Sequence, residues 1–303
     1  MKIAYAFRRN VFYPYRGGRP SMPTGATFDK YVAKLREIGF EGIELGGAGG
    51  DEAAKQAQVD LGKRLRDGGV PCVAISSSGS MSDPKNGAAY RRGWENGIKM
   101  AALIGAGIVN GRMTGGVSNP KGKGAGKGET VSQGGSRDAT EYDFVVNAKA
   151  LRELGDMAAD NGVTLAVEVH QHGIVDNSWS ALHLMEMVNH PNVGINPDLG
   201  NIYWCYDEPE ETNEAAVMAM APKTVYWHCK NLRRIHVPQL EQAYFIYTPL
   251  PDGDLDYRFA ISAMVAAGYK GYLAVEGMRQ GDQITNDGRG VEYVRAILKE
   301  LGA

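Results

Sequence analysis

The stretch VTLAVE, residues 163–168, is a short β-type run that ends on the carboxylate of Glu168. Its large apolar residues Leu165 and Val167 alternate with Ala166 and Glu168. Successive side chains of a strand point to opposite faces, and a barrel strand has helices on one face and the barrel interior on the other. We therefore expect Leu165 and Val167 to face helices, and Glu168 to point inward at the carboxyl end of its strand.

Three later β-type runs repeat this alternation. They are residues 193–198, 224–230 and 271–276. In the first and last of them the inward set ends on Asp198 and Glu276, and in the middle one the inward residue near the carboxyl end is His228. Because the carboxyl ends of parallel barrel strands meet on one rim, we expect these three side chains to converge with Glu168.

The rhythm of short β-type runs and longer helical stretches continues from the first residue almost to the last. The expected strands are residues 2–7, 41–45, 70–75, 107–112, 163–168, 193–198, 224–230 and 271–276. Helices fit between them, and several end on a glycine before the next strand, as at Gly39, Gly162 and Gly268. Eight such units without a linker predict one domain over residues 1–303, a (β/α)8 TIM barrel of the α/β class.

The composition limits the kind of partner. The chain has 303 residues, 43% of them hydrophobic, and a formal net charge of −2. Such a chain has no large positive field, so neither nucleic acid nor an anionic membrane is expected as a partner. It contains no leader-like start and no run of about 18 apolar residues, and Cys72, Cys205 and Cys229 lack zinc-ribbon or redox spacing. We expect a cytoplasmic protein.

Two long connections interrupt the rhythm. Residues 114–138, after the fourth strand, are rich in glycine and lysine. A phosphate loop is one interpretation, but residues 121–128 lack the Walker spacing and its strand-to-helix context. We expect instead a lid over the rim or a segment ordered by a neighbouring subunit.

Residues 231–252 are expected to form a second long loop, after the seventh strand, with aromatic residues suited to lining a pocket. These are Tyr244, Phe245 and Tyr247.

Glu168, Asp198, His228 and Glu276 are candidate metal ligands, separated by 30, 30 and 48 residues. Three carboxylates that meet without a cation repel one another, so a divalent metal is the natural neutraliser. Oxygen-rich ligation with one imidazole favours Mn²⁺ or Mg²⁺, and Co²⁺ or Zn²⁺ can also bind such a site. Each residue also has a structural interpretation: Asp198 in a turn, His228 in the core, the glutamates as caps. Their shared spacing and parity favour the metal.

Several motifs together resemble the sugar phosphate isomerase/epimerase group, which has the xylose isomerase-like TIM barrel. They are GFEGIEL (39–45), LAVEVH (165–170), GINPDLGN (194–201), YWHCKN (226–231), PDGDLDY (251–257) and GYKGYLAVEG (268–277). The resemblance implies that the four candidate ligands match the group's metal ligands. It also implies that Glu168 and Glu276 match the acid/base pair of the ketose 3-epimerases.

The chain departs from this group at two positions. Group members often have a histidine three residues after the metal aspartate, where this chain has Asn201, and ketose 3-epimerases have a second glutamate where this chain has Ile174. Endonuclease IV belongs to the same superfamily, but its three-zinc site needs histidines on early strands. This chain has no histidine before His170, so a nuclease is not expected.

Further polar residues are expected near the rim. His170 follows Glu168 by two residues and is either a general base or a rim histidine bonded to its loop. Lys230 shares the inward parity of His228 and either binds a substrate oxygen or pairs with a carboxylate such as Glu44. Glu44, Asn201, Lys230 and Arg279 form the expected substrate-binding set, with Arg8 and Arg9 as further candidates.

The chemistry that fits these residues is removal of a proton next to a carbonyl, through an enediolate, in a metal-dependent sugar isomerase or epimerase acting on a keto-sugar. The first alternative is lyase-type cleavage of 3-oxo-glycosides by the same enolisation. That reading follows from a resemblance to the catalytic subunits of C-glycoside deglycosidases, which work with a small β-type partner subunit. The second alternative is a non-catalytic sugar-binding subunit. In each case we expect a homo-oligomer.

Overall fold

The fold is built on a sheet of eight parallel strands, found in the part of the chain that this computed structural model describes. The described residues are 1–6, 25–47, 51–114, 135–171, 173–205, 209–240, 242–277 and 281–303. Most of the expected connection 114–138 lies outside these ranges, as do Arg8, Arg9 and Arg279. The barrel strands are β1 (Lys2–Ala6), β2 (Gly42–Gly46), β3 (Cys72–Ser78), β4 (Ile108–Arg112), β5 (Thr164–Glu168), β6 (Val193–Asn196), β7 (Trp227–Cys229) and β10 (Tyr272–Glu276).

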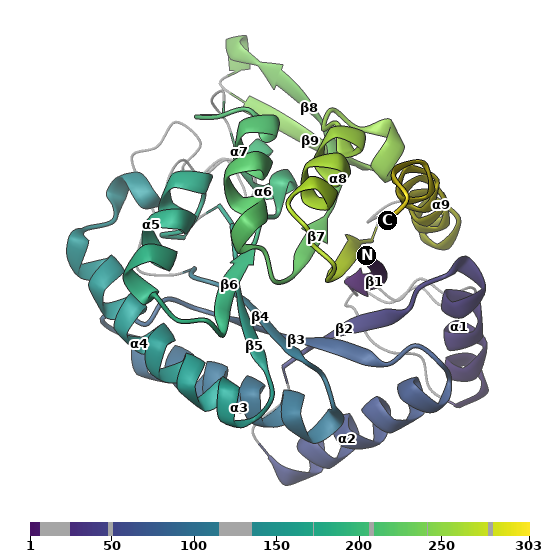
Figure 1. Cartoon of the computed structure of the whole chain (residues 1–303), viewed down its shortest axis with the longest axis horizontal. Helices are drawn as coiled ribbons and strands as arrows, with labels where there is room; N and C mark the ends of the chain where they lie inside the picture. Colours follow the sequence, from purple (N-terminus) through teal and green to yellow (C-terminus); the bar gives the residue numbers. More distant parts are fainter. Residues whose placement is uncertain are drawn as a thin grey trace.

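Helices surround this sheet, as Figure 1 shows. They are α1 (Gly25–Ile38), α2 (Glu52–Asp67), α3 (Gly87–Ile104), α4 (Glu141–Asp160), α5 (Ser178–Val188), α6 (Leu199–Tyr203), α7 (Asn213–Met220), α8 (Tyr257–Ala266) and α9 (Gln283–Leu301). Short 3-10 turns are η1 (Ser136–Asp138), η2 (Ala221–Lys223), η3 (Pro238–Leu240) and η4 (Leu250–Asp252). The predicted stop residues Gly162 and Gly268 have positive φ, of 67° and 79°, which glycine adopts without strain.

The two faces of the strands carry different side chains, as the alternation predicted. The large apolar residues Leu165 and Val167 belong to the main core between strands and helices. A separate interior cluster consists mainly of small residues. Its buried members are Ala4, Ala6, Val73, Ala74, Ala166, Tyr226 and Ala274. The ring of Tyr226 lies among these small side chains, and its centroid is 5.3 Å from that of the His228 ring.

The barrel closes only loosely between β6 and β7. The strand order runs β6-β5-β4-β3-β2-β1-β10-β7, and no continuous ladder joins its two ends. An isolated bridge pairs Ile195 with Thr224, and Val225 N–H donates to the carbonyl of Ile195 at 3.0 Å. The side chain of Asn196 adds a third link, because its Oδ1 accepts a hydrogen bond of 2.7 Å from His228 N–H. We refer to this junction as the β6–β7 seam.

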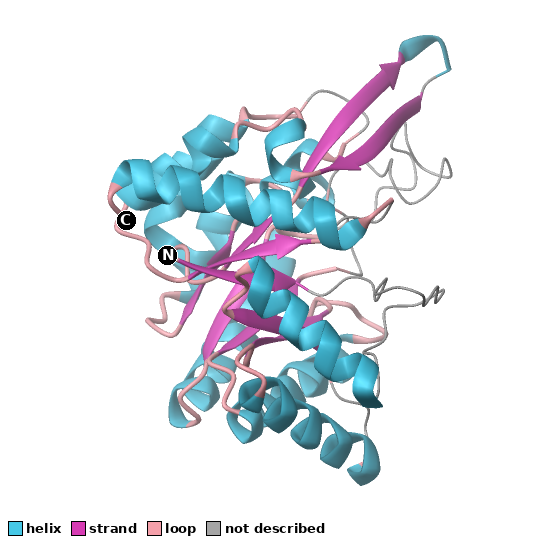
Figure 2. Cartoon of the chain, turned by 90° about the vertical axis from the view of Figure 1, so that its right-hand side faces the viewer, coloured by secondary structure: helices cyan, strands magenta, loops and turns pink. Residues whose placement is uncertain are grey.

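The prediction that residues 231–252 form a long loop is wrong, because most of this stretch forms a β-hairpin. Strands β8 (Asn231–Val237) and β9 (Gln242–Thr248) pair antiparallel, and Figure 2 shows this ribbon projecting from the barrel. Phe245 and Tyr247 pack against Trp204, with ring centroids 5.7 and 5.4 Å apart, whereas Tyr244 is exposed. The alternating apolar residues of this stretch therefore belong to a two-stranded sheet. The length of the stretch alone had indicated only a long connection.

Two barrel strands are shorter than predicted by more than one residue: β6, and β7, which covers only Trp227–Cys229 of the expected residues 224–230. Strand β6 ends at Asn196, and Asp198 instead caps α6, accepting a hydrogen bond from Asn201 N–H. Pro197 has no N–H to donate to a ladder, which explains why β6 ends early.

In the described part of the chain, no helix is long and apolar enough to cross a membrane.

Candidate metal and catalytic site

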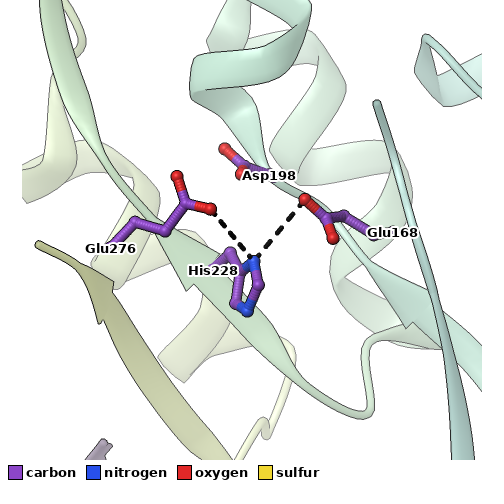
Figure 3. A group of neighbouring side chains, drawn as sticks. All are labelled: Glu168, Asp198, His228 and Glu276. Carbon is purple, nitrogen blue, oxygen red and sulfur yellow. Dashed lines mark ion pairs between the residues drawn. The ribbon is translucent and has the colours of Figure 1, made fainter. Parts of the chain in front are cut away.

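Four buried side chains converge at the carboxyl end of the barrel, as predicted, although Asp198 does so from a helix cap rather than from a strand. Each of Glu168, Asp198, His228 and Glu276 offers one ligand atom, and these atoms lie within 4.8 Å of one another. The residues come from the end of β5, the N-cap of α6, the middle of β7 and the end of β10. Figure 3 shows Glu168 and Glu276 on opposite sides of the His228 ring.

The imidazole of His228 is oriented for metal ligation. Its Nε2 lies 2.7 Å from Glu44 Oε2, so Nε2–H donates to that carboxylate and Nδ1 is the nitrogen left to bind a cation or a second proton. Nδ1 is buried, has no hydrogen-bond partner among the described residues, and lies 3.6 Å from Glu168 Oε1 and 3.7 Å from Glu276 Oε1. A carboxylate behind a ligating histidine is the common arrangement around protein-bound metals. This donor set therefore fits a divalent cation.

The electrostatics of the cluster point the same way. Burial alone would lower the pKa of His228, but Glu44 and Glu168 outweigh it and raise the pKa to about 10. The carboxylates thus create a strongly negative potential at Nδ1. That potential attracts positive charge, either as a proton on the imidazole or as a metal cation beside it.

Lys230 contacts the ligand carboxylates and not Glu44. Its Nζ lies 2.7 Å from Asp198 Oδ2 and 2.8 Å from Glu276 Oε2. Burial opposes its charge, but these two carboxylates raise the pKa of Lys230 well above its usual value. Lys230 is therefore a fixed cation that contacts one oxygen of each carboxylate, while Glu276 Oε1 faces His228.

Asn201, predicted as a substrate contact, has its amide group turned to the ligands. Its Nδ2 lies 3.1 Å from Glu168 Oε1, 3.0 Å from Asp198 Oδ2 and 3.0 Å from the carbonyl of Val169. The short helix α6 places it there, because Asp198 caps the helix and Asn201 is in its first turn. In this position the amide orients two of the carboxylates.

Sequence reasoning missed two further asparagines in the site. Asn110 Nδ2 lies 3.3 Å from Glu168 Oε2, and Asn196 Nδ2 donates to Asn110 Oδ1 at 2.9 Å. Both are fully buried. Extending the parity argument to β4 would have found Asn110, which shares the inward face of its strand. Together they fix the orientation of Glu168.

His170 lies at the edge of the cluster. Its Nδ1 is 2.6 Å from the carbonyl of Gln171, so Nδ1–H donates and Nε2 keeps the lone pair. Burial is the main cause that lowers the pKa of His170 to about 4; Glu168 opposes this effect, and the charges of Lys230 and Arg112 add to it. The ring is therefore neutral near pH 7, with one nitrogen able to accept a proton.

Comparison with known proteins agrees with the fold. The family model for the xylose isomerase-like TIM barrel matches residues 32–300. A xylose isomerase-like TIM barrel protein from Mycobacterium smegmatis, solved in complex with magnesium, is 22% identical with a TM-score of 0.75; the match covers 100% of this chain and 97% of that chain. No protein among the curated sequences matches the chain.

Two further solved structures are epimerases. An L-ribulose 3-epimerase is 18% identical with a TM-score of 0.69, over 100% of this chain and 99% of that chain. A 3-keto-D-glucoside 4-epimerase from E. coli is 14% identical with a TM-score of 0.67, over 98% of this chain and 100% of that chain. The TM-scores show a shared fold despite the low identities, and the family match spans most of the chain. The chain therefore belongs to the xylose isomerase-like TIM barrel family.

Proposed function

We propose that the chain is a divalent-metal-dependent enzyme that isomerises or epimerises a keto-sugar. The observation that carries the proposal is the buried Nδ1 of His228, which has no hydrogen-bond partner in the part of the chain that the structure describes and faces two carboxylates. Glu44 holds the ring in the ligating tautomer. The similarity to epimerase structures, described above, supports the choice of reaction.

The proposed ligands of the cation are Glu168, Asp198, His228 and Glu276. A cation held there would polarise the substrate carbonyl and offset negative charge on its oxygen. We propose Mn²⁺, because three carboxylates and one imidazole form an oxygen-rich set of intermediate softness. Mg²⁺, Co²⁺ and Zn²⁺ can also bind such a set of ligands. The similar structure from Mycobacterium smegmatis was solved in complex with magnesium.

The proposed acid and base are the two glutamates on opposite sides of the cluster. Lys230 contacts Glu276 Oε2, which favours the ionised form of this carboxylate and makes it a base for the proton next to the carbonyl. The C–H electron pair then forms the carbon–carbon double bond of the enediolate, and the π pair of the carbonyl moves onto the carbonyl oxygen. Glu168, held by Asn110 and Asn201, is the acid on the opposite side. A proton returned to the opposite face gives the epimer, and one returned to the neighbouring carbon gives the isomer.

Deuterium exchange tests this reaction. The manganese-loaded protein, incubated with a panel of keto-sugars in D₂O, is expected to place deuterium on the carbon next to the carbonyl of its substrate. Glu276→Gln should lower this exchange by about 10² or more through loss of a general base. Glu292→Gln, on the exposed side of α9, is the matched control and should exchange normally. Metal content is measured for each variant, so that a lost base is separated from a lost cation.

A second candidate is lyase-type cleavage of a 3-oxo-glycoside, and the geometry of His170 favours it. Its neutral ring has Nε2 available as a base beside the cluster, since Nδ1–H is bonded to Gln171. In this reaction the enolised sugar expels its β-substituent, and a small β-type partner subunit is proposed to assist. His170→Ala should then abolish aglycone release and leave the metal bound, with no deuterium entering free sugars.

These outcomes separate the candidates. Exchange into a free keto-sugar that depends on Glu276 supports the epimerase, and release of an aglycone that depends on His170 supports the lyase. Tight sugar binding with neither exchange nor release would support a non-catalytic sugar-binding subunit and overturn both.

A further inference from the structure

Arg112 ends β4 beside the cluster, on the inward face of the strand. A Cβ at Gly111 would lie 2.4 Å from the Trp94 ring of α3, and Met113 belongs to the core between strands and helices. Residues 111 and 113 therefore face the helices, and by alternation Arg112 shares the inward face of Asn110. The register pairs Arg112 with Glu168 on β5. The guanidinium thus belongs to the mouth of the barrel.

This guanidinium has no partner within the described part of the chain. Arg112 is half-buried, and its side chain makes neither an ion pair nor a hydrogen bond to a described residue. Lys230, the other cation of the mouth, is held by two carboxylates. Glu168 does not fill this role, because its oxygens face Asn110, Asn201 and His228. A half-buried charge without a counter-ion is costly, so the position suits a cation that meets its anion in the complex.

We infer that Arg112 binds a carboxylate of the substrate, so that the natural substrate is a sugar acid or its derivative; this inference rests on the proposed function of the site. The guanidinium fork matches a carboxylate with two parallel hydrogen bonds. Neighbouring strands are about 4.8 Å apart, so a group bound by Arg112 lies within a few bonds of one bound at Glu168. A keto-sugar of ordinary length spans that distance.

One guanidinium without a partner among the described residues suits a carboxylate better than a phosphate. A phosphate monoester carries a charge of about −1.5 to −2 at pH 7 and is usually held by several donors. In the described part of the mouth, Lys230 is occupied by Asp198 and Glu276. One planar cation matches one monoanionic group. Ser78, which pairs with Arg112 in the β3–β4 register and is half-buried, adds a neutral hydroxyl beside it.

Calorimetric binding tests this inference with three probes that lack a ketone or aldehyde group: D-gluconate, D-glucitol and D-glucitol 6-phosphate. The manganese-loaded protein should bind gluconate at least about tenfold more tightly than glucitol, the worth of one charge-assisted pair. Arg112→Gln should remove this preference, and Arg112→Lys, which keeps the charge without the fork, should retain part of it. Arg92→Gln, an exposed arginine of α3, is the matched control and should behave as the unaltered protein.

Three results would overturn the inference: equal affinity for gluconate and glucitol, a preference that survives in Arg112→Gln, or tighter binding of the phosphate than of gluconate. A carboxylate that bound the metal directly would give the second result. Because none of the probes can be enolised, their binding does not depend on turnover. Failure of the deuterium exchange would therefore count against the proposed function alone, and equal affinity of the unaltered protein for gluconate and glucitol would count against the role of Arg112 alone.

Discussion

Glu44 Oε2 lies 2.7 Å from His228 Nε2, although 184 residues separate the two in sequence. Both side chains are buried, one on β2 and the other on β7. The contact fixes which ring nitrogen is turned away from Glu44, and that nitrogen faces Glu168 and Glu276. Glu44 therefore sets the ligating form of His228 without belonging to the ligand cluster.

Replacing Glu44 by glutamine should weaken metal binding and spare the fold. The amide offers an oxygen to Nε2–H but no negative charge, so the imidazole becomes a poorer donor. Loss of such a supporting carboxylate typically lowers metal affinity about 10–100-fold. Competition with a fluorescent chelator measures the affinity, with Glu37→Gln on the exposed side of α1 as control. An affinity equal to that of the control would contradict this role.

Asp198→Asn should abolish stoichiometric metal binding. Asp198 has two roles, because it is a candidate ligand and also caps α6. Asparagine caps a helix as well as aspartate does, so the substitution keeps the cap and removes the charge. Elemental analysis of the purified protein reports the occupancy, and Asp160→Asn at the exposed end of α4 is the matched control. Full occupancy in Asp198→Asn would refute the ligand assignment.

Gly111→Ala should destabilise the barrel, whereas Gly107→Ala should not. A Cβ at Gly111 would meet the buried ring of Trp94 at 2.4 Å, but a Cβ at Gly107 would find no atom within 4 Å. Overpacking of this kind typically costs about 1–3 kcal/mol. Urea denaturation of both variants measures the difference. Equal stabilities would show that α3 moves away from β4 without cost.

The stability of the protein should fall at acid pH partly through Asp143. Burial opposes its ionisation, but hydrogen bonds from Ser82 and Thr140 outweigh that effect and lower its pKa. A lowered pKa in the folded state stabilises the fold above the ordinary pKa of an aspartate, about 3.9, and this contribution is lost as the pH falls further. Asp143→Asn should therefore be less stable than the unaltered protein at pH 7.

The difference in the free energy of unfolding between Asp143→Asn and the unaltered protein should decrease as the pH falls below about 4. Protonation of Asp143 then removes the charge in the unaltered protein as well. Urea denaturation at a series of pH values follows it, with Asp160→Asn as control. A gap that stays constant from pH 7 to pH 3 would show that the charge of Asp143 contributes nothing.

Alternation along the strands was enough to predict the centre of the site. Glu168, His228 and Glu276 converge because inward parity and strand ends are both readable in a sequence. The partners of the long side chains were not readable. Lys230 was assigned to Glu44 or to substrate, yet it contacts Asp198 and Glu276, since His228 occupies Glu44. Which carboxylate a lysine pairs with depends on the positions of all the neighbouring side chains, and the sequence alone does not give these positions.

The hairpin of β8 and β9 was missed for a different reason. The segment lies between two βα units, where a connection is expected, and its own alternation of apolar residues is what indicates the hairpin. Paired register from Asn231 with Thr248 to Val237 with Gln242 shows that the segment pairs with itself rather than with the barrel. A search for antiparallel pairs within long connections would have found it.

The β6–β7 seam has a consequence for how the barrel is held shut. Asp198 follows β6 and His228 lies on β7, so any cation bound by both ties together the two ends of the sheet that backbone pairing leaves almost unjoined. The amides of Val225 and His228, which bond across the seam to Ile195 and Asn196, report whether it opens. Their hydrogen exchange should slow when metal is added, because the ion acts as a clasp and part of its binding energy keeps the cylinder closed.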